Sequence, residues 1–207
     1  MLIYFINTPQ DNLSITRDMA GGLGFDASSE TFLPPLELAS YAAILRDAGH
    51  KVKIIDPIAS ELTTNDVLSL CVERKPDYII TTFSLPSFIS DASFVKILKS
   101  LISAPIYVKT SIMFVPILKK FLFDSQADAC LVGEPEFELD KIVNGKTKNG
   151  LAYLKNGKIY IHMPTPVEKL DQLPLPARDL LNNKVYKYPL LGSNTTIIQT
   201  SRGCPYP

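Results

Sequence analysis

The residues most able to do chemistry are a terminal cysteine and several polar loops that follow apolar runs. Cys204 lies in the stretch TTIIQTSRGCPYP, residues 195–207, after four β-branched residues and a Ser-Arg-Gly sequence. β-branched residues favour a strand and the glycine interrupts it, so Cys204 is predicted in a loop at the carboxyl end of a strand. A thiolate there could ligate a metal. The three residues that follow supply no second ligand, so a lone structural cysteine is the alternative.

Four polar loops form the second candidate site. Each follows a predicted strand, and the carboxyl ends of parallel strands meet at one edge of a sheet, where ligands bind near the point at which the strand order reverses. Gly133 is of special interest because glycine lets a backbone approach a ligand closely. The predicted ligand-contacting residues are Asn7, Thr8, Pro9, Ser84, Leu85, Ser87, Lys109, Thr110, Ser111, Gly133, Glu134 and Glu136.

The other cysteines and the histidines are predicted to have structural roles. Cys71 lies on the apolar face of a predicted helix and Cys130 within a predicted strand, so both should pack as small apolar side chains. His50 follows Gly49, a residue suited to end a helix, and is predicted to be a capping or surface residue. His162 ends a predicted hairpin.

Alternating strands and helices position these loops. Apolar runs predict strands at residues 2–7, 51–56, 78–82, 106–109 and 129–132. One-sided apolar patterns predict helices at residues 35–48, 63–75, 91–103, 115–123 and from 136 to about 145. Because parallel neighbours need right-handed crossovers, we predict an α/β fold with a doubly wound five-stranded parallel sheet, flavodoxin-like, in the order 2-1-3-4-5.

Two long segments interrupt or follow this pattern. Residues 8–33 show no sustained period, and their GGLG cluster lies too far beyond the first strand to be a dinucleotide-binding turn, so a flexible loop is predicted. Alternating residues around Asn156 and Gly157 predict a β-hairpin at 150–162. Four prolines then predict an extended linker. We therefore divide the chain into a domain at 1–145, a hairpin and linker at 146–194, and a final strand and loop at 195–207.

Together these motifs resemble the N-terminal part of class B radical S-adenosylmethionine enzymes. TSRGCPYP resembles the start of their Cys-x-x-x-Cys-x-x-Cys loop, and PPLELASYAAILRDAGHKVKIID resembles the cobalamin (B12)-binding domain that precedes their barrel. GEPE at 133–136 matches the family's Gly-Glu-x-Glu turn. The resemblance implies that the chain is cut within the cluster motif and that Cys204 is one ligand of a 4Fe-4S cluster. It also implies that the other ligands and the S-adenosylmethionine site belong to a missing C-terminal radical barrel.

The resemblance leaves two functions open. One is the cobalamin-binding part of a radical enzyme, a methyltransferase or a related one, with no catalysis by the fragment itself. The other is a scaffold or substrate-recruiting domain that has lost cobalamin, because residues 109–113 stand where relatives have a glycine pair. Neither His50 nor His162 stands in the Asp-x-His-x-x-Gly context that supplies an imidazole to cobalt. A flavin-binding module is disfavoured because the first loop lacks a hydroxyl-rich phosphate site. A receiver module is disfavoured because the acidic residues that it needs after the first and third strands are missing.

Composition restricts the partners and the compartment. The chain has 21 basic and 21 acidic residues among 207, so net charge gives no indication of nucleic acid or of an anionic membrane as partner. The first residues lack the features of a secretory leader or a membrane span. With three widely spaced cysteines, these features predict a cytoplasmic protein and leave the oligomeric state open. The corrinoid ligand is implied by the family resemblance alone.

Overall fold

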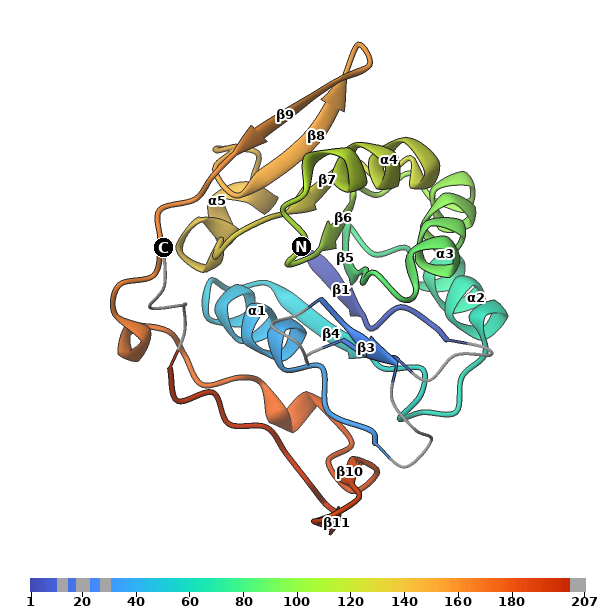
Figure 1. Cartoon of the computed structure of the whole chain (residues 1–207), viewed down its shortest axis with the longest axis vertical. Coiled ribbons are helices and arrows are strands. Elements are labelled where there is room, and N and C mark those ends of the chain that lie inside the picture. Colours follow the sequence, from blue (N-terminus) through green and yellow to red (C-terminus); the bar gives the residue numbers. More distant parts are fainter. Residues whose placement is uncertain (11–14, 18–22, 27–30, 202–207) are drawn as a thin grey trace.

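A seven-stranded sheet is the centre of the fold. The computed structural model describes residues 1–10, 15–17, 23–26 and 31–201. The strand order is β4-β1-β5-β6-β7-β8-β9, with the first five strands parallel and the last two antiparallel (Figure 1). The strands are β1 Leu2–Ile6, β4 Lys51–Ile55, β5 Tyr78–Thr82, β6 Ile106–Lys109, β7 Ala129–Leu131, β8 Leu151–Lys155 and β9 Lys158–His162. The parallel part has the predicted order 2-1-3-4-5, so the predicted fold class is confirmed.

Helices cover both faces of the parallel strands. α1 and α5 lie on one face, and α2, α3 and α4 lie on the other (Figure 1). Each face packs into its own apolar core, which explains why the parallel strands are nearly continuous apolar runs. The helices are α1 Leu36–Asp47, α2 Thr64–Arg74, α3 Phe88–Leu101, α4 Val115–Ser125 and α5 Leu139–Val143, with short 3-10 helices at Glu136–Glu138, Leu170–Gln172 and Arg178–Leu180.

Helix α2 shows how local sequence sets an element boundary. The Thr63 hydroxyl accepts a hydrogen bond from the backbone N–H of Asp66, and the Asp66 carboxylate accepts one from the Thr63 N–H. This capping box satisfies two N–H groups that have no partner within the helix. It starts the helix after Thr63, at the predicted beginning of the helix at 63–75.

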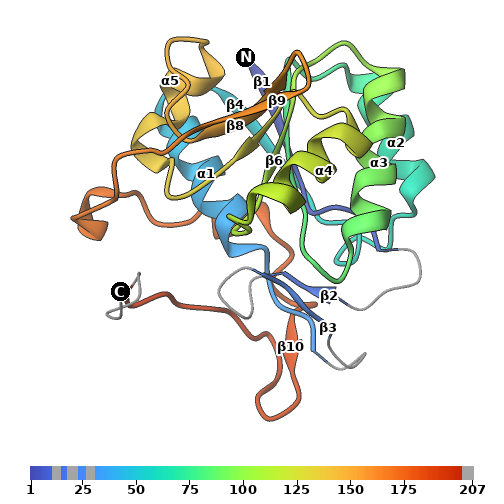
Figure 2. The same ribbon diagram turned by 45° about the horizontal axis from the view of Figure 1, so that its top comes forward.

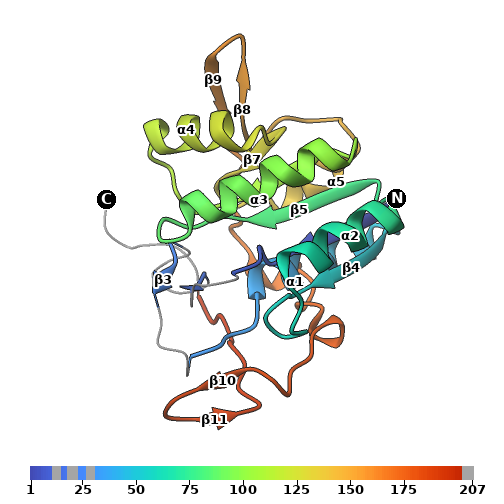
Figure 3. The same cartoon turned by 90° about the vertical axis from the view of Figure 1, so that its right-hand side faces the viewer.

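The hairpin is part of the main sheet, which therefore has seven strands where five were predicted. β8 pairs with β7, and the N–H of Val132 donates to the carbonyl of Gly150 at 2.9 Å. Leu151 and Ala152 are buried, one in each core. An unpaired β7 edge would leave backbone groups without partners, so the hairpin completes the sheet, and its far end extends past the helices (Figure 3).

Two small two-stranded sheets lie at the carboxyl end of the main strands. β2 Ile15–Thr16 pairs with β3 Phe25–Asp26, and β10 Lys187–Tyr188 pairs with β11 Gly192–Ser193. Figure 2 shows both on the side of the molecule opposite the N-terminus. Residues 195–201, the described part of the predicted last strand, form no strand, because none of the described strands pairs with them.

Within the described residues, no helix is both long enough and apolar enough to cross a bilayer.

Candidate functional site at the carboxyl edge of the sheet

The strand order reverses between β1 and β5, and hydroxyl groups join the two strand ends there. The Thr8 and Thr81 hydroxyls are 2.6 Å apart, and the Thr81 hydroxyl donates to the carbonyl of Ile6 at 2.9 Å. The Thr8 hydroxyl also donates to the carbonyl of Thr82. The loop after β1 is therefore fixed against β5, and the predicted residues Asn7 and Thr8 lie at the switch point.

Arg17, which the sequence analysis did not identify, fills this switch point. One terminal nitrogen, Nη1, donates to Asn7 Oδ1 and to the Thr8 carbonyl, both at 3.1 Å. The other, Nη2, forms an ion pair with Asp91 Oδ1 at 2.6 Å and lies 3.5 Å from Ser87 Oγ. Its side chain is only 7% exposed and that of Asp91 is fully buried. One sequence signal was available: Arg17 is the only basic residue before Arg46.

Asp91, in the first turn of α3, organises the loop after β5. Its Oδ2 accepts from the Ser87 hydroxyl at 2.5 Å and from the Ser84 N–H at 3.2 Å, and the Ser84 and Ser87 hydroxyls are 2.7 Å apart. Burial raises the pKa of Asp91 above its ordinary value, and the Arg17 charge is the main influence that opposes this rise. The predicted Ser84 and Ser87 thus serve as partners of Asp91.

A second buried carboxyl group lies beyond the end of β4. Asp56 Oδ1 accepts from the Asn7 amide at 3.1 Å, and its Oδ2 accepts from the Tyr186 hydroxyl at 2.9 Å. Burial raises the pKa of Asp56, although these two hydrogen bonds lower it. Tyr186 is fully buried and comes from the linker, so the linker is bound directly to the switch point.

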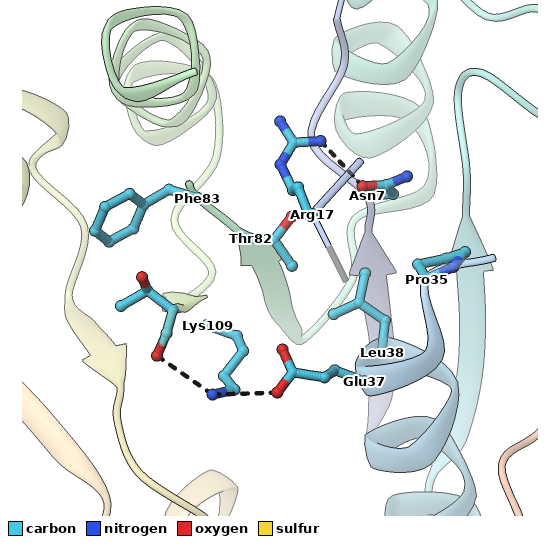
Figure 4. A pocket seen from close by; sticks show the side chains of 9 residues that line it. Asn7, Arg17, Pro35, Glu37, Leu38, Thr82, Phe83 and Lys109 are labelled. Atoms are coloured by element: carbon cyan, nitrogen blue, oxygen red, sulfur yellow. Dashed lines mark hydrogen bonds and ion pairs between the residues drawn. The ribbon is translucent and has the colours of Figure 1, made fainter. Parts of the chain in front are cut away.

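Lys109 occupies the edge between β5 and β7. Its Nζ lies 3.4 Å from Glu37 Oε1 on α1, and it donates to the carbonyls of Thr110 at 3.3 Å and Gly133 at 3.4 Å (Figure 4). The side chain is 4% exposed. Lys109 therefore fills space at the loop where, according to the family resemblance, relatives have a glycine pair.

The linker covers the turn after β7. Gly133 has a φ of +65°, and a Cβ placed on it would lie 2.9 Å from Pro164 Cδ. The N–H of Val167 donates to Glu134 Oε2 at 3.1 Å. Gly133 thus allows the close approach of Pro164, and the linker packs on the turn where a ligand was predicted. Contact of Gly133 with a ligand stays a prediction.

The cavity found between the described residues at the switch point is small. A cavity of about 20 Å³ adjoins both Arg17 and Lys109 (Figure 4). That is room for one or two water molecules. Two buried polar atoms on its lining residues, Arg17 Nε and Thr82 Oγ1, have no hydrogen-bond partner in the described part of the chain. The lining residues are Asn7, Arg17, Pro35, Glu37, Leu38, Thr82, Phe83, Lys109 and Thr110.

A corrin ring does not fit this cavity. In the described conformation a corrinoid could only lie across the outer surface of the loops. The predicted residues with accessible surface there are Leu85, Ser111, Gly133 and Glu134. The remaining predicted residues are buried, namely Asn7, Thr8, Pro9, Ser84, Ser87, Lys109, Thr110 and Glu136.

Cys71, Cys130 and the two histidines lie outside the switch point, although His162 ends β9 at the same edge of the sheet. Cys71 and Cys130 are fully buried in one apolar core, as predicted, and Cys204 lies outside the described residues. His50 follows α1 at the opposite edge of the sheet, with Nε2 3.0 Å from Asp140 Oδ1, and His162 stacks on Tyr153 in the hairpin. The described part of the chain has no group of three His, Cys, Asp or Glu side chains that could hold a metal ion.

Comparisons with known proteins agree with the fold. No protein-family model matches the sequence. The chain is 32% identical over 184 residues to an uncharacterized methyltransferase of Pyrococcus horikoshii. It is 29% identical over 188 residues to an anaerobic magnesium-protoporphyrin IX monomethyl ester cyclase of Synechocystis. Each match includes 84% of this chain but only 39% and 37% of the respective relative, so the chain spans less than half the length of either.

Solved structures show the same architecture. The apo form of OxsB, a cobalamin-dependent S-adenosylmethionine radical enzyme, matches with a TM-score of 0.64 and 18% identity, over 86% of this chain and 24% of that one. Its form with aqua-cobalamin and S-adenosylmethionine bound also matches with a TM-score of 0.64, at 16% identity. The resemblance predicted from the sequence is therefore confirmed at the level of the fold: the chain has the fold of part of a cobalamin-dependent S-adenosylmethionine radical enzyme.

Proposed function

We propose that this chain is the cobalamin-binding N-terminal part of a longer radical S-adenosylmethionine enzyme, a methyltransferase or a related enzyme. The observation that carries the proposal is the switch-point sheet, which matches part of a cobalamin-dependent radical enzyme in fold. The sequence relationship to a methyltransferase supports it.

The corrinoid would bind at the carboxyl edge of β1, β5, β6 and β7. Leu85 and Ser111 offer an apolar and a polar contact on the outer surface of two adjacent loops, and Glu134 offers a carboxylate on a third. Cobalamin would supply a carrier for a methyl group in the full-length protein. A corrin ring seated deeper would require the Arg17 side chain to leave the switch point, because the cavity there is only about 20 Å³.

The cluster and the second cofactor belong to the same proposal. Cys204 would be one of three thiolates that hold a 4Fe-4S cluster in the full-length enzyme, where S-adenosylmethionine would bind. One thiolate cannot hold such a cluster, so we expect that anaerobic reconstitution leaves the 207-residue chain without iron and sulfide. A stoichiometric cluster in this chain would contradict the assignment of the other ligands to a further domain.

Titration of the chain with hydroxocobalamin tests corrinoid binding. We expect weak, saturable binding by equilibrium dialysis, and a visible spectrum that is unchanged when His50 and His162 are both replaced by alanine. His50 precedes β4 at the opposite end of the sheet, and His162 lies at the carboxyl end of β9, two strands beyond β7, where its ring stacks on Tyr153, so neither should ligate cobalt at the switch point. If the folded chain binds no corrinoid, the proposal is wrong and the scaffold alternative replaces it. If the spectrum depends on a histidine, the placement of the corrinoid is wrong.

A further inference from the structure

Four hydrogen-bond acceptors at the switch point surround the guanidinium group of Arg17 and together form a slot. They are Asn7 Oδ1, the Thr8 carbonyl, Asp91 Oδ1 and Ser87 Oγ, at 3.1, 3.1, 2.6 and 3.5 Å from the two terminal guanidinium nitrogens. Two come from the end of β1 and two from the start of α3. The slot therefore lies across the point where the strand order reverses, which is the usual place for a ligand in such a sheet.

The chain fills this slot with a side chain from outside the parallel sheet. Arg17 follows the small strand β2, and its side chain reaches the ends of β1 and α3 at the switch point. The fit is incomplete, because Arg17 Nε and the neighbouring Thr82 hydroxyl remain buried without partners. A buried polar group without a partner is unfavourable. The occupied slot is thus held by strong contacts but leaves two hydrogen-bonding groups unused.

We infer that this slot is a binding subsite for a planar N–H donor group. Arg17 occupies the subsite in the present structure, and a primary carboxamide of a corrinoid takes it when Arg17 leaves. The inference rests on the proposed function for the identity of the ligand. The slot itself follows from the contacts of Arg17.

The chemistry of the slot selects the ligand class. Its wall presents a carboxylate, a carbonyl, an amide oxygen and a hydroxyl, so a phosphate or a carboxylate would meet acceptors and a negative charge. A primary carboxamide offers two N–H donors in a plane, as one end of a guanidinium does. Its carbonyl oxygen can in turn accept from the unpartnered Thr82 hydroxyl. Corrinoids carry primary carboxamides around the ring, so they can compete with Arg17 for the same acceptors.

The test compares the chain with Arg17→Ala, which empties the slot, and Arg17→Met, which keeps most of the side-chain volume. Arg46→Met is the matched control, because Arg46 also forms an ion pair, with Asp179, but is exposed and distant from the slot. Hydroxocobalamin should bind both Arg17 variants about fivefold or more tightly than the wild type, since the ligand no longer competes with Arg17. Binding to Arg46→Met should equal that of the wild type.

Guanidinium and acetamide test the slot without the corrinoid. Each, at low millimolar concentration, should raise the thermal midpoint of Arg17→Ala and leave that of the wild type unchanged, and acetate should raise neither. If Arg17→Ala does not fold, Arg17→Met provides the corrinoid comparison. Equal corrinoid affinity of the wild type and the Arg17 variants would overturn the subsite while leaving the proposed function intact. Absence of corrinoid binding by all folded variants would overturn both, and stabilisation of the wild type as much as of Arg17→Ala would overturn the slot.

Discussion

Two buried carboxyl groups determine the electrostatics of the carboxyl edge. Asp91 is paired with Arg17, while the described partners of Asp56 are neutral: the side chains of Asn7 and Tyr186 and the backbone of Ile58 and Ala59. Burial raises the pKa of both carboxyl groups. A carboxyl group that is easier to protonate in the folded chain contributes stability at low pH, and this contribution is lost as pH rises through the folded-state pKa.

The free energy of unfolding should therefore depend on pH through the ionisation of Asp56. Between the ordinary carboxyl pKa of 3.8 and the raised pKa of Asp56, the folded chain keeps a proton that the unfolded chain has released. The free energy of unfolding should fall as pH rises through this window. Urea unfolding of Asp56→Asn, which cannot ionise, should show a shallower fall than the wild type. Asp171→Asn, at an exposed site, is the control, and equal slopes for Asp56→Asn and the wild type would refute the assignment.

The two core cysteines should be chemically inert in the folded chain. Burial raises the pKa of Cys71 to about 11, and burial also raises the pKa of Cys130. At pH 8 both thiols are protonated and inaccessible, and only a thiolate reacts readily with iodoacetamide. Peptide mapping should find both unmodified in buffer and both modified in urea. Modification of either one at the same rate in both conditions would show that it is not buried.

At the scale of elements, several contacts along its length bind the linker to the sheet domain. Tyr186 donates to Asp56, the N–H of Ala177 donates to the carbonyl of Ala39 at 3.0 Å, and Pro164 packs on Gly133. The predicted extended linker is thus attached along α1 and the carboxyl edge. The path of the linker depends on Gly133, because a side chain there would meet Pro164.

A comparison of substitutions at Gly49 and Gly133 distinguishes the cost of backbone strain from the cost of displacing the linker. Gly49 and Gly133 have φ of +88° and +65°, but only Gly133 has a neighbour at its Cβ position, Pro164. Gly49→Ala should cost about 1 kcal/mol of folding free energy through strain alone. Gly133→Ala should cost more and should speed tryptic cleavage at the exposed Lys169, because the linker must move. Equal costs and equal cleavage rates would mean that the contact with Pro164 contributes nothing.

At the scale of the whole molecule, the hairpin belongs to the cooperative unit. A chain ending at residue 145 would lose β8 from the edge of β7 and expose the surface that Leu151 and Ala152 cover. A chain ending at residue 163 keeps the hairpin and lacks the rest of the linker. The difference in the free energy of unfolding between the two chains therefore measures the contribution of the hairpin. We expect the shorter chain to be less stable by about 3 kcal/mol or more in urea unfolding. Equal stability would support a domain boundary at residue 145.

Local sequence patterns determined the architecture. Apolar runs and one-sided apolar helices predicted five parallel strands in the observed order, and Asn156-Gly157 predicted the hairpin. These features follow from the sequence because strand and helix periodicity, glycine at positive φ and crossover handedness act over short stretches of chain. The sequence also predicted that the polar residues at the strand ends lie close together, because parallel topology brings those ends to one edge of the sheet.

Only the tertiary structure decided what those polar residues contact. The pairing of Arg17 with Asp91 spans 74 residues, and the bond from Tyr186 to Asp56 spans 130. Arg17 lies in an aperiodic loop and Tyr186 in a proline-rich linker, so neither sequence carries a pattern that fixes where its side chain lies. Their burial depends on acceptors gathered from separate elements, because a charge or hydroxyl leaves water only where partners replace the water. That requirement can be met only once the sheet, α3 and the linker have come together.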